Sequence, residues 1–240
     1  MKQQFVTRLK QKSGAFTLVE LLIVCAVIAL LLAMILPPLV NTMAASRLTS
    51  AGDRLQSLLA QAQQIALSDG RPVEVRLYRH RLDNSSASGF HYRTAYLLRY
   101  YDIGEASPVL GESGVTLTAP MKLYAGESLM LPDGVVMASA TAASSLLSFT
   151  PVSGEGGTTD TYILTPGGKA PYQFPSDEYE FQSFVFRPTS TNLPSGTSDK
   201  WFVTLISDTE ESEGKAMADI PNYYCVQVDP VNGRVTTYRP

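Results

Sequence analysis

The chain has little of the residue types on which catalytic and metal-binding proteins rely. It holds two cysteines, two histidines and one tryptophan among 240 residues. Because zinc requires clustered ligands, two isolated cysteines do not predict a zinc site. Charged residues make up 17% of the chain and hydrophobic residues 45%, a composition that excludes an intrinsically disordered protein. The net charge of -3 gives no general attraction to nucleic acid.

Motifs of catalysis are also missing. His80 and His91 lie outside any His-Glu-x-x-His arrangement, and the sequence has no Gly-x-Ser-x-Gly nucleophile elbow. Residues 165–170 contain Gly-Gly-Lys, but they lack the glycine spacing and the Ser or Thr that a phosphate-binding loop needs. We therefore expect both histidines on surface strands or loops, and we predict that the protein is not an enzyme.

Charge and hydropathy are distributed unevenly along the chain. Residues 1–15 hold four bases and no acid, and the remainder is acidic. Residues 21–36 are sixteen consecutive apolar residues, and extending the run back to Phe16 adds one charge, Glu20. As a helix, residues 16–36 span roughly 31 Å, about the thickness of a bilayer's hydrocarbon core. The positive-inside rule places the N-terminus in the cytoplasm and the body of the chain outside.

A conventional secretory signal is the alternative for this segment, with residues 42–44 as its cleavage site. Signal peptides usually have shorter apolar runs and no acid at the start of the run. Apolar residues also recur at helical spacing from Leu48 to Ala66, before Asp-Gly-Arg-Pro at residues 69–72 ends the pattern. We expect one long helix over residues 16–70. Its transmembrane part covers residues 16–36, and its amphipathic part covers residues 39–69.

After residue 70 the pattern becomes the alternation that is typical of strands. Asn232 and Gly233 tolerate the positive φ that tight hairpin turns require, so they predict an antiparallel hairpin near the C-terminus. A helix packed on an antiparallel sheet belongs to the α+β class, with a β-rich head at residues 71–240. The candidate strands cover residues 73–78, 90–101, 134–137, 145–149, 181–186, 201–206, 223–228 and 234–238.

The sequence Gly-Ala-Phe-Thr-Leu-Val-Glu-Leu-Leu-Ile-Val at residues 14–24 resembles the N-terminal cleavage and methylation segment of type IV pilins and type II secretion pseudopilins. The resemblance implies a type IV pilin-like fold. It also implies that residues 1–15 are a leader peptide, which a prepilin peptidase removes just before Phe16, and that the new Phe16 amine is methylated. The family has Gly before the cut, whereas this chain has Ala15 there and Gly14 one residue earlier. Cleavage after Gly14, inefficient cleavage or no cleavage therefore remain alternatives.

The resemblance also assigns roles to Glu20 and to two prolines. Pro37 and Pro38 follow the first apolar stretch, where the family has a proline that kinks the helix. Glu20 would aid subunit docking. A charge costs on the order of 2.5 to 3.5 kcal/mol at the bilayer centre, so Glu20 should have a partner, such as a neighbouring subunit's N-terminal ammonium. The alternative is that Glu20 lies at the headgroups and stabilises the helix N-terminus through the macrodipole.

Later segments are similar to the GspH/FimT-type minor pseudopilins and to the Verru_Chthon cassette protein D family. The similarity implies a minor pseudopilin that assembles into a type II secretion pseudopilus or a type IV pilus-like filament. Its partners would be the prepilin peptidase, other pilin or pseudopilin subunits, the inner-membrane assembly platform and lipid. It would cross the inner membrane once, with a periplasmic head. The alternative function is a non-polymerising, membrane-anchored periplasmic protein that binds a ligand or an envelope component. The segments that carry the similarity are residues 58–76, 92–96, 131–135 and 228–234.

No cofactor is predicted, although one acidic segment is a candidate calcium site. Hard oxygen ligands bind calcium, but a solvated hairpin tip is the favoured interpretation. Cys25 and Cys225 lie in different parts of the chain and are not expected to pair. Tyrosines and arginines at residues 92–101 are able to stack on single-stranded nucleic acid, but packing within a sheet is favoured and nucleic acid is not an expected partner. The acidic segment contains Asp208, Glu210, Glu211 and Glu213.

Overall fold

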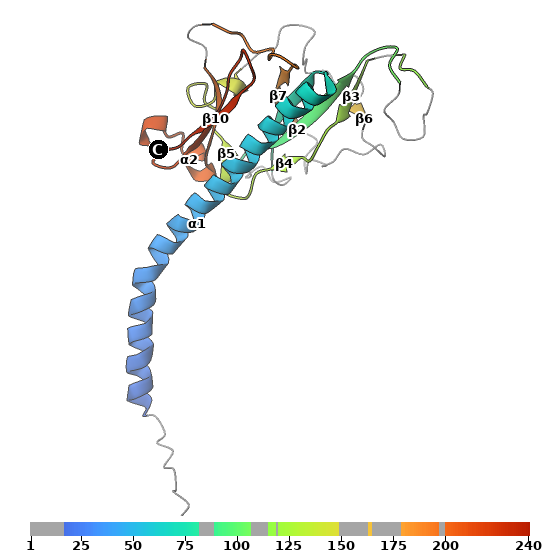
Figure 1. Cartoon of the computed structure of the whole chain (residues 1–240). Coiled ribbons are helices and arrows are strands. Elements are labelled where there is room, and N and C mark those ends of the chain that lie inside the picture. The colour runs from blue at the N-terminus through green and yellow to red at the C-terminus, as the bar shows by residue number, and fades with distance from the viewer. Residues whose placement is uncertain are drawn as a thin grey trace, which may run out of the picture. The chain divides into compact units, whose positions relative to one another are not determined.

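Figure 1 shows the computed structural model of the chain. It describes residues 17–81, 89–106, 115–118, 120–148, 163–164, 179–196 and 200–240, except for the side chains of residues 33–41 and 163–164. The chain divides into two compact units, Met1–Met43 and Ala44–Pro240. We call the second one the head unit. It begins inside the long helix, so it contains the C-terminal part of that helix as well as the strands.

Helix α1 runs over Leu18–Asp69. It ends where Gly70 adopts a φ of 66°, a left-handed conformation that glycine reaches without strain, and Pro72 follows two residues later. In the head unit, α1 buries one apolar stripe against the sheet, at intervals of three and four residues. The stripe consists of Leu48, Ala51, Leu55, Leu58, Leu59, Ala62 and Ala66.

The described strands form one sheet in the order β10-β9-β8-β5-β2-β1-β7, with β3 and β4 also paired to β2. All these pairs are antiparallel, and only β6, which pairs with β3, is parallel to its neighbour. This arrangement confirms the α+β class. The strands are β1 (Val73–His80), β2 (His91–Tyr101), β3 (Met121–Tyr124), β4 (Leu129–Met130), β5 (Val135–Met137), β6 (Ile163–Leu164), β7 (Tyr179–Phe186), β8 (Trp201–Ser207), β9 (Tyr224–Val228) and β10 (Val235–Tyr238).

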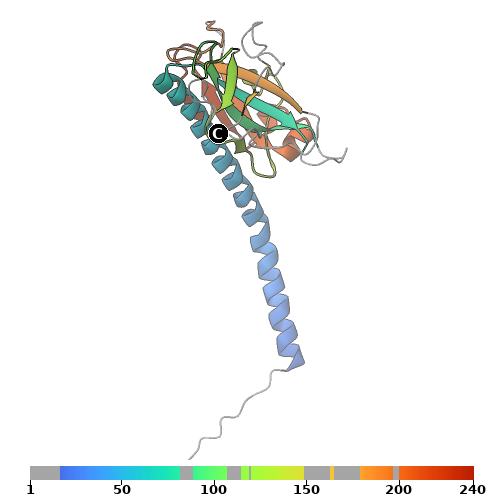
Figure 2. The ribbon, with the colours of Figure 1, turned by 90° about the vertical axis from the view of Figure 1, so that its right-hand side faces the viewer.

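The main core of the head unit lies between α1 and one face of the sheet, and Figure 2 shows α1 running along that face. Strand residues of the core alternate with residues of the opposite face, as the pleat of a strand requires. Leu205 belongs to the main core, whereas its neighbour Ile206 packs in a smaller cluster with Val136 and Ile220. Helix α2 (Asp208–Ser212) and the short 3₁₀ helix η2 (Met217–Asp219) follow β8.

The predicted C-terminal hairpin is confirmed. Strands β9 and β10 pair antiparallel, and Gly233 between them has a φ of 71°. The Asp229 N–H donates to the Arg234 carbonyl at 2.9 Å and closes the turn. The side-chain amide of Gln63 on α1 donates to the Asn232 carbonyl at 2.8 Å, so the turn is also fastened to the helix.

The predicted strand at residues 145–149 is wrong. Ser145–Leu147 form a 3₁₀ helix, η1. Two serine hydroxyls accept hydrogen bonds from the backbone of β8, where a neighbouring strand would otherwise supply carbonyls. The Thr204 N–H donates to Ser144 Oγ at 3.0 Å, and the Phe202 N–H donates to Ser145 Oγ at 2.9 Å. Short polar side chains compete with strand pairing in this way.

Candidate functional site

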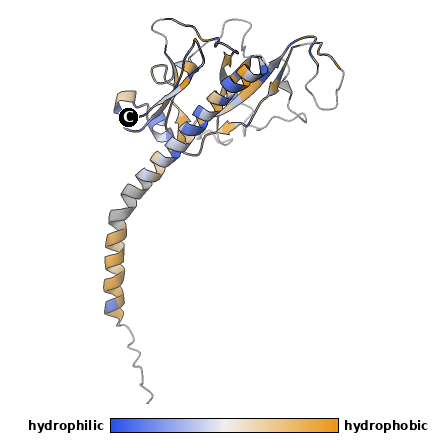
Figure 3. Cartoon of the chain, viewed as in Figure 1, coloured by the Kyte–Doolittle hydropathy of each residue, from blue (hydrophilic) through white to orange (hydrophobic). Residues whose placement is uncertain are grey.

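The first part of α1 presents apolar side chains on all sides. Its large hydrophobic residues from Leu18 to Leu32 are 50% to 79% exposed, and Cys25 among them is also exposed. Figure 3 shows this part of α1 as hydrophobic over most of its length. A helix that is hydrophobic all round is normally surrounded by lipid or by other helices. The exposed surface is therefore one that another apolar phase must cover.

Glu20 takes part in a capping box at the start of α1. Its Oε2 atom accepts hydrogen bonds from the N–H and the hydroxyl of Thr17, both at 3.1 Å. In return, the Glu20 N–H donates to Thr17 Oγ1 at 3.2 Å. This reciprocal pair satisfies backbone donors that a helix N-terminus leaves free. The carboxylate thus lies where the alternative prediction of helix stabilisation places it, and it is exposed to a further partner.

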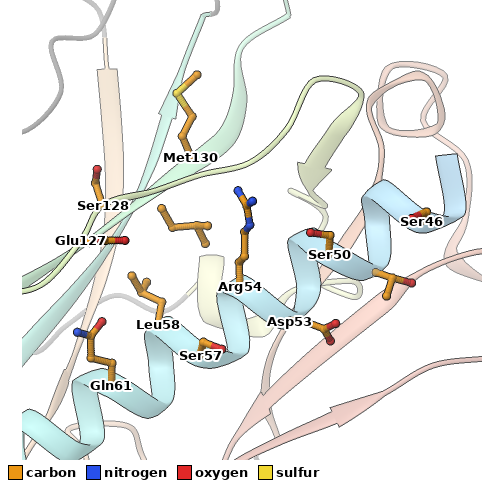
Figure 4. A pocket seen from close by; sticks show the side chains of 12 residues that line it. Ser46, Ser50, Asp53, Arg54, Ser57, Leu58, Gln61, Glu127, Ser128 and Met130 are labelled. Carbon is orange, nitrogen blue, oxygen red and sulfur yellow. The ribbon is translucent and has the colours of Figure 1, made fainter. Parts of the chain in front are cut away.

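A groove of about 880 Å³ lies along the exposed side of α1 in the head unit. Figure 4 shows it between the helix and the segment that carries Glu127, Ser128 and Met130. Its helix side extends from Ser46 to Gln61, roughly 22 Å at the rise of an α-helix. Most of the residues that line it have polar side chains. The remaining lining residues are Thr49, Ser50, Asp53, Arg54, Ser57, Leu58 and Leu129.

Asp53 fastens one edge of this groove to the C-terminal hairpin. The Tyr224 hydroxyl donates to Asp53 Oδ1 at 2.8 Å, and Arg239 Nη2 donates to the same oxygen at 3.2 Å. The Arg239 guanidinium also lies 4.5 Å from the Tyr224 ring centroid. The ring faces Gly52, where a Cβ atom would lie only 2.3 Å from the Tyr224 Cγ atom. Burial, followed by the contact with Asp53, raises the pKa of Tyr224. We call these four residues the C-terminal clasp.

Two other charged residues of the groove are uncommitted. The side chains of Arg54 and Glu127 are both exposed, and neither forms a hydrogen bond or an ion pair with any residue that the structure describes. Figure 4 shows Arg54 directed from α1 toward the segment with Met130, whereas Asp53 points away from that segment. The groove therefore offers one positive and one negative group to a ligand or partner.

The beginning of the chain carries a recognisable family motif. Residues 10–36 match the prokaryotic N-terminal methylation motif. This motif is a type IV pilin-like signal, so it implies processing by a prepilin peptidase and pilin-type assembly, and it suggests a membrane-anchored N-terminus. Glu20 and its capping box lie within the motif. No curated protein and no solved structure matches the chain.

Several predicted site residues of the methylation motif cannot be placed. Gly14, Ala15 and Phe16 lie outside the described residues. Pro37 and Pro38 fall within the bounds of α1, but their side chains are not among those that the structure describes. The kink at these residues stays a prediction. In the part of the chain that the structure describes, no helix has the length and apolar character needed to cross a membrane.

Three of the four acidic residues of the candidate calcium site have separate partners. Asp208 accepts a hydrogen bond from Arg93 at 3.2 Å, Glu211 from the Ser139 N–H at 2.8 Å, and Glu213 pairs with Lys215 at 2.9 Å. Across the described residues, no three His, Cys, Asp or Glu side chains gather as metal ligands do. Calcium binding at Asp208, Glu210, Glu211 and Glu213 therefore stays a prediction without geometric support.

The prediction of two surface histidines is wrong for His80, whose exposed fraction is zero. Its Nε2 atom lies 2.8 Å from the Thr94 hydroxyl, and its Nδ1 atom lies 2.8 Å from the Arg81 carbonyl. Burial and the charge of Arg93 lower the pKa of both His80 and His91. His80 is buried because protein covers both faces of β1. The alternation of apolar and polar residues predicts one buried face and does not reveal that the other face is buried as well.

The aromatic and basic residues of β2 are engaged within the fold. Tyr92 and Tyr96 are buried, and the Tyr100 hydroxyl donates to Glu74 at 2.9 Å. Arg99 pairs with Asp69 at the end of α1 at 2.9 Å. These side chains therefore serve the packing that the sequence favoured over stacking on nucleic acid.

Sequence reasoning missed a buried charge cluster on β1. Glu74 and Arg76 have exposed fractions of zero, and Arg76 Nε donates to Glu74 Oε1 at 2.7 Å. Lys122 on β3 reaches Glu74 Oε2 at 2.8 Å, and the Arg76 guanidinium stacks 4.4 Å from the Phe181 ring centroid. Burial alone would raise the pKa of Glu74 and lower that of Arg76. The attraction between the opposite charges outweighs burial, so the pKa of Glu74 is lowered and that of Arg76 is raised. The only signal in the sequence is the opposite charge at positions 74 and 76.

Proposed function

We propose that this protein is a non-enzymatic, type IV pilin-like structural subunit, a minor pseudopilin that assembles into a type II secretion pseudopilus or a type IV pilus-like filament. The proposal extends the pilin-like signal at residues 10–36 to the whole chain. The α+β head with a long N-terminal helix is compatible with a pilin-like fold. In this proposal the head lies in the periplasm, and the N-terminus is cytoplasmic before processing.

The observation that carries the proposal is the exposed apolar surface between Leu18 and Leu32, headed by a single acid. Burying such side chains is worth about 1.5 to 3 kcal/mol each in water. In the membrane, lipid covers this surface before assembly. In a filament, helices of neighbouring subunits replace the lipid, and tight helix packing then favours association. Glu20 marks the level at which one helix docks against the next.

Glu20 has to exchange partners for this to happen. In the isolated subunit its carboxylate accepts two hydrogen bonds from Thr17. In the filament it would accept the methylated ammonium of Phe16 from a neighbouring subunit. A charge-assisted hydrogen bond in a low-dielectric environment is stronger than a neutral one, so the exchange favours the assembled state. Glu20→Gln keeps the shape of the side chain and removes the charge.

The experiment combines processing and assembly in the native host. Intact mass should show a chain that begins at methylated Phe16, and sheared surface or pseudopilus fractions should contain it. We expect Glu20→Gln to be inserted and processed normally but to be absent from filaments. Asp133→Asn, which removes an exposed carboxylate of the head unit outside the groove, is the matched control and should be processed normally.

Two results would contradict the proposal. A purified chain that retains residues 1–15 would leave a permanent anchor, and a chain that starts near Ala45 would indicate a conventional signal peptide. The first result would favour the membrane-anchored binding protein, with the groove on α1 as its binding surface, and the second would leave a binding protein without its anchor.

A further inference from the structure

The groove on α1 points to a contact between head units. We propose that it receives the acidic segment around α2, residues 208–219, of a second copy of this chain. The inference rests on the proposed function, because a filament is what brings copies together side by side. It adds to that function a specific head contact, separate from the packing of the apolar helices.

The positive side of this contact is the exposed face of α1. Arg47 and Arg54 lie seven residues apart, so they project from the same side of the helix. Neither side chain has a hydrogen bond or ion pair with a described residue, and Asp53, between them in the sequence, is already held by Tyr224 and Arg239. The uncommitted charge of this face is therefore positive.

The negative side is the segment that contains α2 and η2. Residues 208–219 hold five acids and one base. The side chains of Glu210 and Asp219 form no hydrogen bond or ion pair with the described residues. The contact with Glu213, followed by the charges of Glu210 and Asp219, raises the pKa of Lys215. The acids of this segment outnumber the internal partners that they have. The carboxylates of Glu210 and Asp219 are therefore available to arginines of another molecule.

The groove and the acidic segment complement each other in two respects. Arg54 faces an acidic partner such as Glu210, and Glu127 on the opposite lip favours a partner that also carries a base, which Lys215 supplies. Figure 2 shows α1 along one side of the head unit and α2 on the other side. Contacts between two different surfaces of the same chain are heterologous, and they propagate into a ring or a helix rather than closing as a two-fold dimer.

The test is disulfide cross-linking between copies of the full-length chain in the membrane of the native host. Ser50→Cys marks the groove in one tagged copy, and Thr209→Cys marks α2 in a second copy with a different tag. Both copies carry Cys25→Ala and Cys225→Ala, so that the native thiols take no part. We expect an oxidant to produce a mixed dimer that contains both tags.

Charge reversal then tests the recognition. Arg54→Glu or Glu210→Arg alone should lower the mixed dimer by about tenfold, because like charges meet at the interface. The two reversals placed together in opposite copies should restore it. Arg234→Glu, an exposed reversal on the C-terminal hairpin, is the control and should leave the yield unchanged.

No mixed dimer, or a yield that is insensitive to Arg54→Glu, would overturn the inference. The mass of the N-terminus is measured on the same samples. Processed Phe16 without a mixed dimer refutes only the head contact. An unprocessed chain that still cross-links in a charge-dependent way refutes the filament role and keeps the contact.

Discussion

Replacing Gly52 by alanine should loosen the C-terminal clasp, although the same change stabilises most helices. Alanine is favoured over glycine inside a helix by about 1 kcal/mol. In this position, however, the new Cβ would lie 2.3 to 2.4 Å from three atoms of the Tyr224 ring. Those atoms are at the base of the ring, and the hydroxyl at its tip is held by Asp53, so the ring cannot slide aside and keep its bond.

The magnitude follows from what the ring loses. Removing a large buried aromatic side chain costs about 3 to 5 kcal/mol, and overpacking costs about 1 to 3 kcal/mol. Tyr224 is 2% exposed, so displacing it approaches the first figure. After subtracting the helix gain of about 1 kcal/mol, we expect a net loss of about 2 to 4 kcal/mol. For a unit of this size, each kcal/mol lowers Tm by about 2 to 4 °C.

The assay is thermal unfolding of the full chain in mild detergent, followed by tryptophan fluorescence. Trp201 is the only tryptophan in the sequence, and it packs against the main core, so its signal reports the head unit alone. Ser57→Ala, an exposed change on the same helix, is the control and should be slightly stabilising. Combining Gly52→Ala with Tyr224→Ala should cost less than the sum of the two, because the clash is then gone. Wild-type stability of Gly52→Ala, or strict additivity, would refute the reasoning.

Two further predictions concern buried charge and pH. Arg76→Met leaves the carboxylate of Glu74 buried with Lys122 as its remaining cation, and we expect urea unfolding to show a loss of about 3 kcal/mol, the lower end for a broken buried pair. Adding Glu74→Leu should recover part of the loss, and a larger loss in the double variant would contradict this. The pKa of His80 and His91 is lowered in the folded protein, so the unfolded chain binds protons more tightly, and stability should fall as the pH drops below about 6.5. Melting temperatures at pH 7.5 and pH 5.5 measure this slope, which His80→Gln should reduce; an unchanged slope would exclude His80 as its source.

Local patterns in the sequence predicted the helix stripe and most strands. Leu55 and Leu59 lie one helical turn apart, so the helix period alone places both on the buried face of α1. The turn at Gly233 was predictable because its positive φ is a local property that glycine favours. The N-terminal motif was found for the same reason, since its residues are consecutive and their order is its signal.

Other features depend on contacts between distant parts of the chain. Alternation in β1 places Glu74 and Arg76 on the same face of the strand. Whether solvent or protein covers that face depends on segments distant in the sequence. The groove also depends on distant contacts, because Arg54 and Glu127 line the same groove only when α1 packs beside the segment that carries β4. At η1, two serine hydroxyls accept the hydrogen bonds of β8 that a neighbouring strand would otherwise accept. The strand propensity of this segment does not predict those side-chain hydrogen bonds.

The C-terminal clasp also has a consequence for biogenesis. Tyr224 and Asp53 are separated by 171 positions, and Arg239 and Asp53 by 186, so Asp53 is synthesised long before its partners. Until β9 and β10 arrive, the apolar stripe of α1 lacks part of its cover, and contacts of such long sequence separation form slowly. The head unit therefore completes its fold only after β9 and β10 have been synthesised. Prematurely terminated chains should expose Leu55 and Leu59 to proteases, which would remove incomplete subunits before they reach an assembly site.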